Sequence, residues 1–226
     1  MQRSFLICIF LILFPAMQAQ KDPDSQIGGY LFAHMTSDDY GRLYYSISPD
    51  GLEWTLLNDG KSVSEEYRGH PDICQGHDGR FYQIGVEEKT EKVILWSSED
   101  LLEWKREKFL PDDLFRNTPG HRSNPSWFGA PKTFYDPSTR KYLISWHAPE
   151  EGIPKEDFTR YWCSMRTFFV TTGDFESFTK PRRLFSFEMG TIDVIVRKEG
   201  DLYYALIKDE CEATATWPTG KSIRCL

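Results

Sequence analysis

"LYYSISPDGLEWTLL" (Leu43–Leu57) is the stretch that decides the fold, because its pattern returns twice along the chain. Its counterparts are "VILWSSEDLLEWKRE" (Val93–Glu107) and "FFVTTGDFESFTKPR" (Phe168–Arg182). Each begins with alternating apolar residues, passes a serine or threonine and an acidic residue, and then reaches an aromatic residue; these aromatics are Trp54, Trp104 and Phe178. The pattern predicts a strand, a tight polar turn and the start of another strand, with the aromatic ring packed structurally under the turn.

A second type of unit alternates with the first. It places an Asp/Gly/Ser-rich turn before a short, aromatic-rich strand, as in "HDGRFYQIGVE" (His77–Glu87), "DPSTRKYLISWH" (Asp136–His147) and "KEGDLYYALIKDE" (Lys198–Glu210). Such turns join the strands of hairpins. Two alternating hairpin units that repeat every several tens of residues predict an all-β protein built from the four-stranded blades of a β-propeller.

The repeats divide the chain into about three and a half blades. We expect three blades near Gly28–Leu57, Gly69–Leu110 and Asn124–Phe185, and a fourth that begins at Gly190 and is still continuing at Leu226. The third unit carries an extra loop over residues 150–162. The mixed charges of this loop favour a solvated surface segment over a cover for one face of the propeller.

The N-terminus predicts export. Met1–Arg3 is short and basic, Ser4–Ala16 is an apolar run too short to span a membrane, and Ala19 is a small residue suited to cleavage. We therefore expect a signal peptide over residues 1–19, a propeller domain over residues 20–226, and a secreted or periplasmic location. No segment after residue 19 is apolar enough to span a bilayer.

The charge of the chain limits the classes of partner it can bind, and its cysteines bear on its disulfide bonds. With 27 Lys+Arg against 34 Asp+Glu, the formal net charge is -7, which excludes the electrostatic footprint of nucleic-acid binding. Four cysteines remain after the signal peptide: Cys74, Cys163, Cys211 and Cys225. In an oxidising compartment they can pair in three ways, or some can stay reduced as small buried residues.

The landmarks resemble, in their order along the chain, the five-bladed propeller glycoside hydrolases, above all glycoside hydrolase family 43. That superfamily includes arabinanases, arabinofuranosidases and xylosidases. The resemblance rests on "SPDGLEWTLLNDG", "HPDICQGHDGRFY", "SSEDLLEW", "WFGAPKTFYDPSTRKYLISW" and "GTIDVIVRKEGDLYYALIKDE". It implies an incomplete five-bladed propeller and, in complete relatives, inverting hydrolysis by two carboxylates. It also implies an oligosaccharide or a plant or algal polysaccharide containing arabinose, xylose or galactose as the partner.

The resemblance assigns catalytic positions one at a time. Asp193, in Thr191-Ile192-Asp193, matches the aspartate that tunes the pKa of the acid. The position of the base aspartate is taken by His70, and Asp72 stands two places later. Because positions two apart on a strand share a face, Asp72 is a candidate substitute for the base. A strand or turn role is the alternative for each of these residues.

Two further positions depart from the pattern of the family. Its "WAPE" motif reads Gly129-Ala130-Pro131-Lys132 here, so Lys132 replaces an acidic residue. The glutamate that serves as general acid comes after the point where this chain ends, and Glu210 and Glu212 do not lie in its motif. The sequence therefore predicts that the acid is missing.

Other residues are candidates for sugar binding. Trp127 and Phe128 could stack on a sugar ring or pack in the core. His147 could line the pocket, and Arg68 could bind a hydroxyl or carboxylate, unless it is simply a solvated charge. No metal or cofactor site is predicted, although a His70/Asp72/His77 cluster and a structural cation in the propeller channel are alternatives.

Three functional hypotheses remain open. The chain is an exported glycoside hydrolase, a non-catalytic propeller that binds carbohydrate, or a piece of a longer propeller. The third hypothesis is compatible with either of the first two. The changes at His70 and Lys132 favour binding without catalysis, whereas the motif order and the signal peptide favour the hydrolase.

Overall fold

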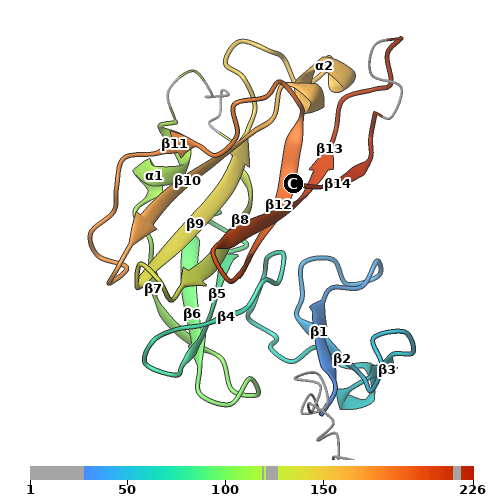
Figure 1. Ribbon diagram of the computed structural model, residues 1–226, viewed down its shortest axis with the longest axis vertical. Helices are drawn as coiled ribbons and strands as arrows, with labels where there is room; N and C mark the ends of the chain where they lie inside the picture. The colour runs from blue at the N-terminus through green and yellow to red at the C-terminus, as the bar shows by residue number, and fades with distance from the viewer. Residues whose placement is uncertain (1–27, 119, 121–126, 216–219) are drawn as a thin grey trace, which may run out of the picture.

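The computed structural model describes residues 28–118, 120, 127–215 and 220–226 (Figure 1). The predicted signal peptide, residues 1–19, lies outside the described residues. Within the part of the chain that is described, no helix is both long and apolar enough to cross a membrane.

Four antiparallel sheets form the domain, and in each sheet every strand pairs with the next strand along the chain. The first sheet holds β1 (Tyr30–His34), β2 (Tyr44–Ser48) and β3 (Thr55–Leu56), and the second holds β4 (Cys74–Gln75), β5 (Phe81–Val86), β6 (Val93–Ser98) and β7 (Lys105–Phe109). The third holds β8 (Gly129–Asp136), β9 (Lys141–Ala148), β10 (Arg166–Thr172) and β11 (Arg182–Arg183), and the fourth holds β12 (Thr191–Glu199), β13 (Leu202–Asp209) and β14 (Ile223–Cys225).

This arrangement confirms the prediction of an all-β, incomplete propeller. The four sheets fall in the four segments that the repeats delimit, and Figure 1 shows them following one another around the molecule. The helical elements are short: η2 (Asn58–Gly60), α1 (Asp112–Arg116) and α2 (Phe158–Cys163).

The repeated acidic residue explains why each hairpin turns where it does. Asp50, Asp100 and Asp174 each accept hydrogen bonds from two backbone N–H groups of their own turn, at 2.8–3.2 Å. These bonds lower the pKa of all three carboxyls and so hold them ionised. The residue after each aspartate, Gly51, Leu101 or Phe175, has a positive φ, so the aspartate loop supports a strained backbone.

The recurring aromatic residues differ in their packing. Trp104 is partly buried, and its indole N–H donates to the Tyr45 hydroxyl of the preceding sheet at 3.0 Å. Phe178 packs likewise against the core. Trp54 is 43% exposed, against our prediction of a packed ring. The reason is that among the described residues no sheet precedes the first one to cover it.

The core lies between neighbouring sheets. One apolar cluster lies between the first and second sheets, another between the second and third, and another between the third and fourth. Each cluster combines strand residues of the two sheets it joins, as face-to-face packing requires. In the described residues no such cluster joins the fourth sheet to the first; apolar side chains of β1, β13 and β14 remain exposed, among them Phe32, Leu206 and Ile223.

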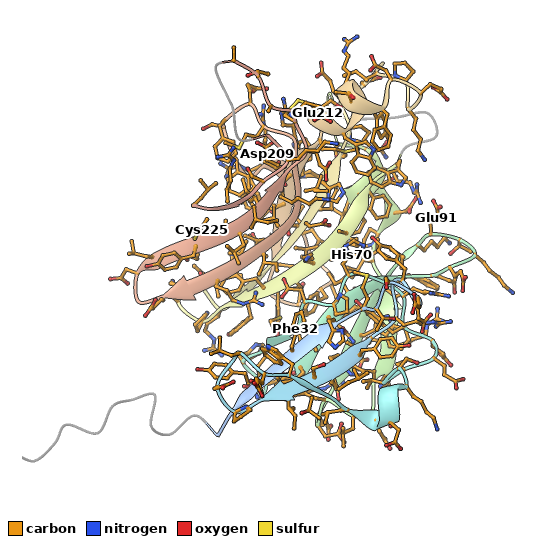
Figure 2. All side chains as sticks on the ribbon, turned by 90° about the vertical axis from the view of Figure 1, so that its right-hand side faces the viewer. Phe32, His70, Glu91, Asp209, Glu212 and Cys225 are labelled. Atoms are coloured by element: carbon orange, nitrogen blue, oxygen red, sulfur yellow. A yellow bond between two sulfur atoms is a disulfide. The ribbon has the colours of Figure 1, made fainter. Side chains whose placement is uncertain are left out.

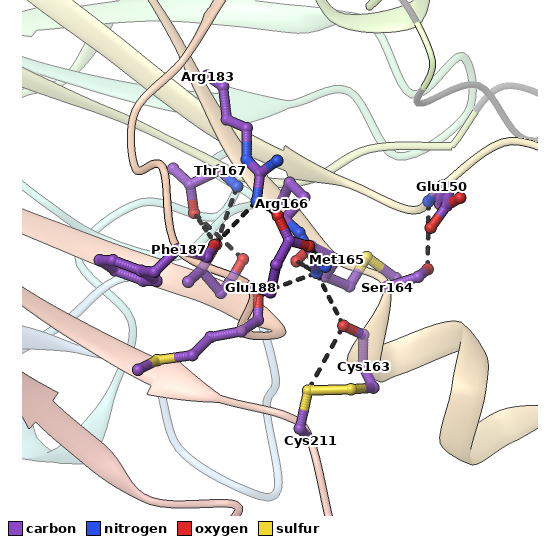
Figure 3. A network of polar contacts seen from close by, with 12 residues as sticks. Glu150, Cys163, Ser164, Met165, Arg166, Thr167, Arg183, Phe187, Glu188 and Cys211 are labelled. Atoms are coloured by element: carbon purple, nitrogen blue, oxygen red, sulfur yellow. Dashed lines mark hydrogen bonds and ion pairs between the residues drawn. A yellow bond between two sulfur atoms is a disulfide. The ribbon is translucent and has the colours of Figure 1, made fainter.

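A disulfide ties the end of α2 to the segment that follows β13 (Figure 3). Cys163, the last residue of α2, is bonded to Cys211, which follows β13, whereas Cys74 and Cys225 are free. Arg166 reinforces the same region: its guanidinium donates to the backbone carbonyls of Cys163 and Met165 and pairs with Glu188 at 2.6 Å. Of the pairings that the sequence left open, the structure selects one bond between the third and fourth units.

Candidate active site

The first strands of the second, third and fourth sheets converge, because β8 contacts both β4 and β12. Asp193 lies in β12 at an irregularity in the pairing between Ile192 and Ile195, and its φ of 51° is in the left-handed region. Bulges and strained non-glycine residues of this kind re-aim a side chain and are common near functional sites.

Asp193 is held by a short chain of polar contacts. Its Oδ1 lies 3.1 Å from Nδ1 of His70, and the Nε2 of His70 lies 2.8 Å from the Tyr40 hydroxyl. Figure 2 shows His70 in the middle of the molecule, between the first sheet and the sheets above it. One chain of contacts thus links residues from three different segments, with His70 between Tyr40 and Asp193.

The surroundings of Asp193 keep it ionised. Burial acts to raise its pKa, but the hydrogen bond to His70 and the charges of His147, His70 and Lys132 outweigh this effect and lower the pKa to about 2. His147 behaves in the opposite way: burial is the largest effect and lowers its pKa to about 4, so the imidazole is neutral at neutral pH. The site therefore combines a carboxylate with a neutral buried histidine.

Two adjoining cavities share Asp193, His70 and Lys208 as lining residues. The first, which we call the aromatic cavity, has a volume of about 450 Å³ and is also lined by Tyr40, Trp127, His147, Phe158, Trp162 and Glu210. The second, the lysine cavity, has a volume of about 440 Å³ and is also lined by Phe32, His34, Lys132, Ile195, Leu206 and Ile223. Both volumes lie in the range of small-molecule sites.

The predicted base substitute, Asp72, does not join this site. Its carboxylate accepts a 2.7 Å bond from the Arg197 guanidinium, its side chain is 3% exposed, and it lines neither cavity. We expected Asp72 to share a strand face with His70, but β4 begins only at Cys74. Residues 70–73 do not form a strand, so two residues that are two positions apart in this segment need not share a face. The structure brings His70, and not Asp72, to Asp193.

Trp127 and His147 both line the aromatic cavity, as expected, and their ring centroids lie 5.6 Å apart. Gly129 permits this approach, because a side-chain carbon there would collide with both rings. Phe128 is a correction: it is 8% exposed and packs in the core, with its ring centroid 5.2 Å from that of Phe115. The neighbouring Trp127 lines the cavity, whereas Phe128 is taken up by the core.

Arg68 is also placed away from the predicted sugar contacts. Its guanidinium donates to the backbone carbonyl of Tyr40 at 2.8 Å and approaches Glu88 at 3.5 Å, and it lines neither cavity. It therefore holds the segment that carries Tyr40, whose hydroxyl in turn meets His70.

Lys132, in contrast, lines the lysine cavity. It follows a pairing irregularity in β8, where Ala130 has a φ of 42°, and it is 6% exposed. The position that is acidic in the resembled family thus presents a buried cation beside Asp193.

Several site residues were not predicted from the sequence. Glu210 directly follows β13 and lines the aromatic cavity, where it pairs with Lys208 at 2.6 Å. Its backbone N–H bonds to the Gly190 carbonyl at 2.8 Å, because antiparallel pairing sets the end of β13 beside the start of β12. Tyr40, Phe158 and Trp162 complete the wall, and the last two come from the loop that we expected to be solvated.

No group of three or more possible metal ligands occurs in the described part of the chain. In particular, Asp72 pairs with Arg197 and His77 packs against Tyr135, so the His70/Asp72/His77 alternative is not assembled.

Residues 25–224 match a family model described as a "probable glycosyl hydrolase domain", which is related to glycoside hydrolase family 43. The chain belongs to this family. The match covers nearly all of the four sheets and agrees with the resemblance that the motif order indicates. Among curated proteins none matches this chain.

Solved structures of other glycosidases share the fold. A fructofuranosidase variant from Schwanniomyces occidentalis, complexed with fructosylnystose, is 11% identical with a TM-score of 0.56; the alignment covers 86% of this chain and 38% of that one. A variant of the GH32 β-fructofuranosidase BmSUC1 from Bombyx mori, in complex with sucrose, is 18% identical with a TM-score of 0.54, over 88% of this chain and 44% of that one. The chain thus spans less than half the length of these enzymes, and at such identities the likeness concerns the fold.

Proposed function

We propose that this chain is an exported carbohydrate-active domain that hydrolyses an O-glycosidic bond of a plant or algal polysaccharide at Asp193. The main observation in support of this proposal is that the two cavities share a wall. An ionised carboxylate stands where both cavities meet, so sugar units bound on its two sides would place their linkage over it.

The residues that line the two cavities suit parts of this chemistry. The rings of Trp127 and Trp162 offer apolar faces to a sugar. Asp193, ionised above a pH of about 2, can accept a proton from water or stabilise positive charge on the reacting sugar. Glu210 supplies a second carboxyl group in the aromatic cavity; it would have to leave its pairing with Lys208 in order to protonate the leaving oxygen.

Two further observations support the proposal. The similar structures named above contain bound sucrose and fructosylnystose, which are oligosaccharides. The Cys163–Cys211 disulfide fits an oxidising compartment, as does the predicted signal peptide.

Hydrolysis is tested with aryl arabinofuranosides, xylosides and galactosides and with the matching polysaccharides. We expect turnover that falls by about a hundredfold or more in Asp193→Asn and in Glu210→Gln, as is usual when a group that acts in the transition state is lost. Glu212→Gln is the matched control, because Glu212 is an exposed glutamate two positions away that pairs with Lys221. Turnover that is unaffected in Asp193→Asn would refute the assignment.

Binding without hydrolysis is the second candidate, and a specific observation favours it. His70 stands where the resembled family keeps its base, and both carboxylates of the site already have partners, His70 for Asp193 and Lys208 for Glu210. Under this alternative the same sugars bind to the chain and are recovered intact, and Asp193→Ala weakens their binding. Release of product by the wild-type chain would exclude it.

A further inference from the structure

Lys132 is a mostly buried lysine that has no partner among the described residues. It is 6% exposed, it lines the lysine cavity, and it makes no hydrogen bond or ion pair with any residue that the structure describes. Its Nζ is not among the fully buried atoms that lack a partner, so the ammonium group and its three donors are open to the cavity. The stem of Lys132 is therefore buried, while its charged end is open to the cavity and meets no acceptor among the described residues.

The other charged groups of the lysine cavity are already engaged. Asp193, the only carboxylate among the described residues that line it, has a 3.1 Å contact with His70. Lys208, the second lysine of the wall, pairs with Glu210 at 2.6 Å. Lys132 acts on Asp193 through its charge at longer range, but the two side chains form no ion pair. Among the charged side chains of this wall in the described residues, Lys132 is thus the one without a partner in the protein.

The remaining wall is mostly apolar. Phe32, Ile195, Leu206 and Ile223 line it, and the rings and methyl groups of Phe32, Leu206 and Ile223 are about half exposed or more. Figure 2 places Phe32 on the upper side of the first sheet, facing the sheets above. Such a wall suits the C–H face of a sugar, and a charge pair formed beside it is screened less than one in open water.

We propose that the lysine cavity binds a sugar unit that carries an anionic group, a carboxylate or a sulfate, and that the Lys132 ammonium binds this group. The inference depends on the proposed function only in taking a glycan as the ligand. The expected glycan has an acidic sugar unit in the lysine cavity, on one side of Asp193. Its neutral unit lies against the rings of the aromatic cavity.

The test compares matched ligands on the full chain. The probes are methyl galacturonoside, methyl galactoside and methyl galactoside 6-sulfate, with affinities measured by calorimetry or ligand-observed NMR. We expect at least one of the two anionic probes to bind about tenfold more tightly than the neutral one, which is the usual gain from a charge-assisted hydrogen bond. The tighter of the two identifies the group as a carboxylate or a sulfate.

Variants test whether Lys132 is the residue that causes the preference for an anionic probe. Lys132→Met, which conserves the buried stem, removes the preference; Lys132→Arg retains it; and Lys180→Met, at an exposed lysine that lines neither cavity, leaves it unchanged. If Lys132→Met does not fold, the lysines of the wild-type chain are ¹³C-methylated instead. The Lys132 resonance then shifts with the preferred anionic probe and not with methyl galactoside.

The outcomes separate this inference from the proposed function. Equal affinity for neutral and anionic probes, or a preference that survives in Lys132→Met, overturns the role of Lys132 while sugar binding stands. If no probe binds, and the aryl glycosides and polysaccharides are neither bound nor cleaved, both proposals fail together.

Discussion

His70 and Asp193 are 123 positions apart in the chain, yet Nδ1 of His70 lies 3.1 Å from Oδ1 of Asp193. The contact joins the segment before β4 to the irregularity in β12, and so ties the second sheet to the fourth at the centre of the molecule. Because the same carboxylate lines both cavities, this pair controls the charge at the point where a glycosidic bond would lie.

The first prediction concerns that pair. In His70→Ala, the pKa of Asp193 rises from about 2 towards or above its ordinary value, because burial still opposes ionisation and the hydrogen bond is gone. A carboxyl ¹³C NMR titration measures the change. His77→Ala is the control, since His77 packs on Tyr135 away from the site. A pKa that stays near 2 in His70→Ala would show that other groups hold the charge.

The second prediction is a loss of stability in mild acid that depends on His147. The unfolded chain takes up a proton on this histidine near the ordinary pKa of 6.5, whereas the folded chain does so only near pH 4. Stability therefore falls as the pH falls from 6.5 to 4, by about 3 kcal/mol from this group. Urea unfolding across this range should show a smaller loss for His147→Gln. Parallel curves for the variant and the wild type would contradict the assignment.

The third prediction concerns the disulfide. Replacing both Cys163 and Cys211 with serine lowers the free energy of unfolding by about 2–4 kcal/mol, the usual range for loss of such a bond. It also loosens α2 and thereby alters Trp162 in the wall of the aromatic cavity. Chemical denaturation and tryptophan fluorescence measure the two effects. Cys225→Ser, at a free and exposed cysteine, should change neither.

The fourth prediction separates two neighbouring aromatic residues. Phe128→Ala destabilises the fold by about 3–5 kcal/mol, because it empties a buried site in the core. Trp127→Ala weakens sugar binding several-fold, because it removes a ring from the aromatic cavity. Thermal unfolding and ligand-observed NMR on both variants distinguish them. The reverse pattern would mean that Phe128, and not Trp127, contacts the ligand.

The repeated hairpin pattern was sufficient to predict the sheets, because each unit contains its own strand and turn signals. The Asp100 turn, for example, is built from residues within a few positions of each other. The resemblance to the family singled out Asp193 within Thr191-Ile192-Asp193; the structure places this residue in β12 beside both cavities, and its role stays a prediction.

The rest of the site depends on contacts that one sequence does not contain. Asp72 was expected on a strand face shared with His70, but the strand starts later and Arg197, from the fourth sheet, takes the carboxylate. Glu210 reaches the site only through the register of β13 on β12. Trp162 reaches it because a disulfide fixes the loop that carries it. These are long-range constraints, and local periodicity carries no signal for them.

We propose that the glycosidic bond of a bound oligosaccharide lies over Asp193, with one sugar unit in each cavity. A crystal structure of Asp193→Asn soaked with an oligosaccharide that the wild-type chain binds or cleaves tests it most directly. We expect one ring against Trp127 in the aromatic cavity, the next ring in the lysine cavity beside Lys132, and the linking oxygen beside residue 193. An oligosaccharide bound elsewhere, or one whose linkage lies away from residue 193, would contradict it.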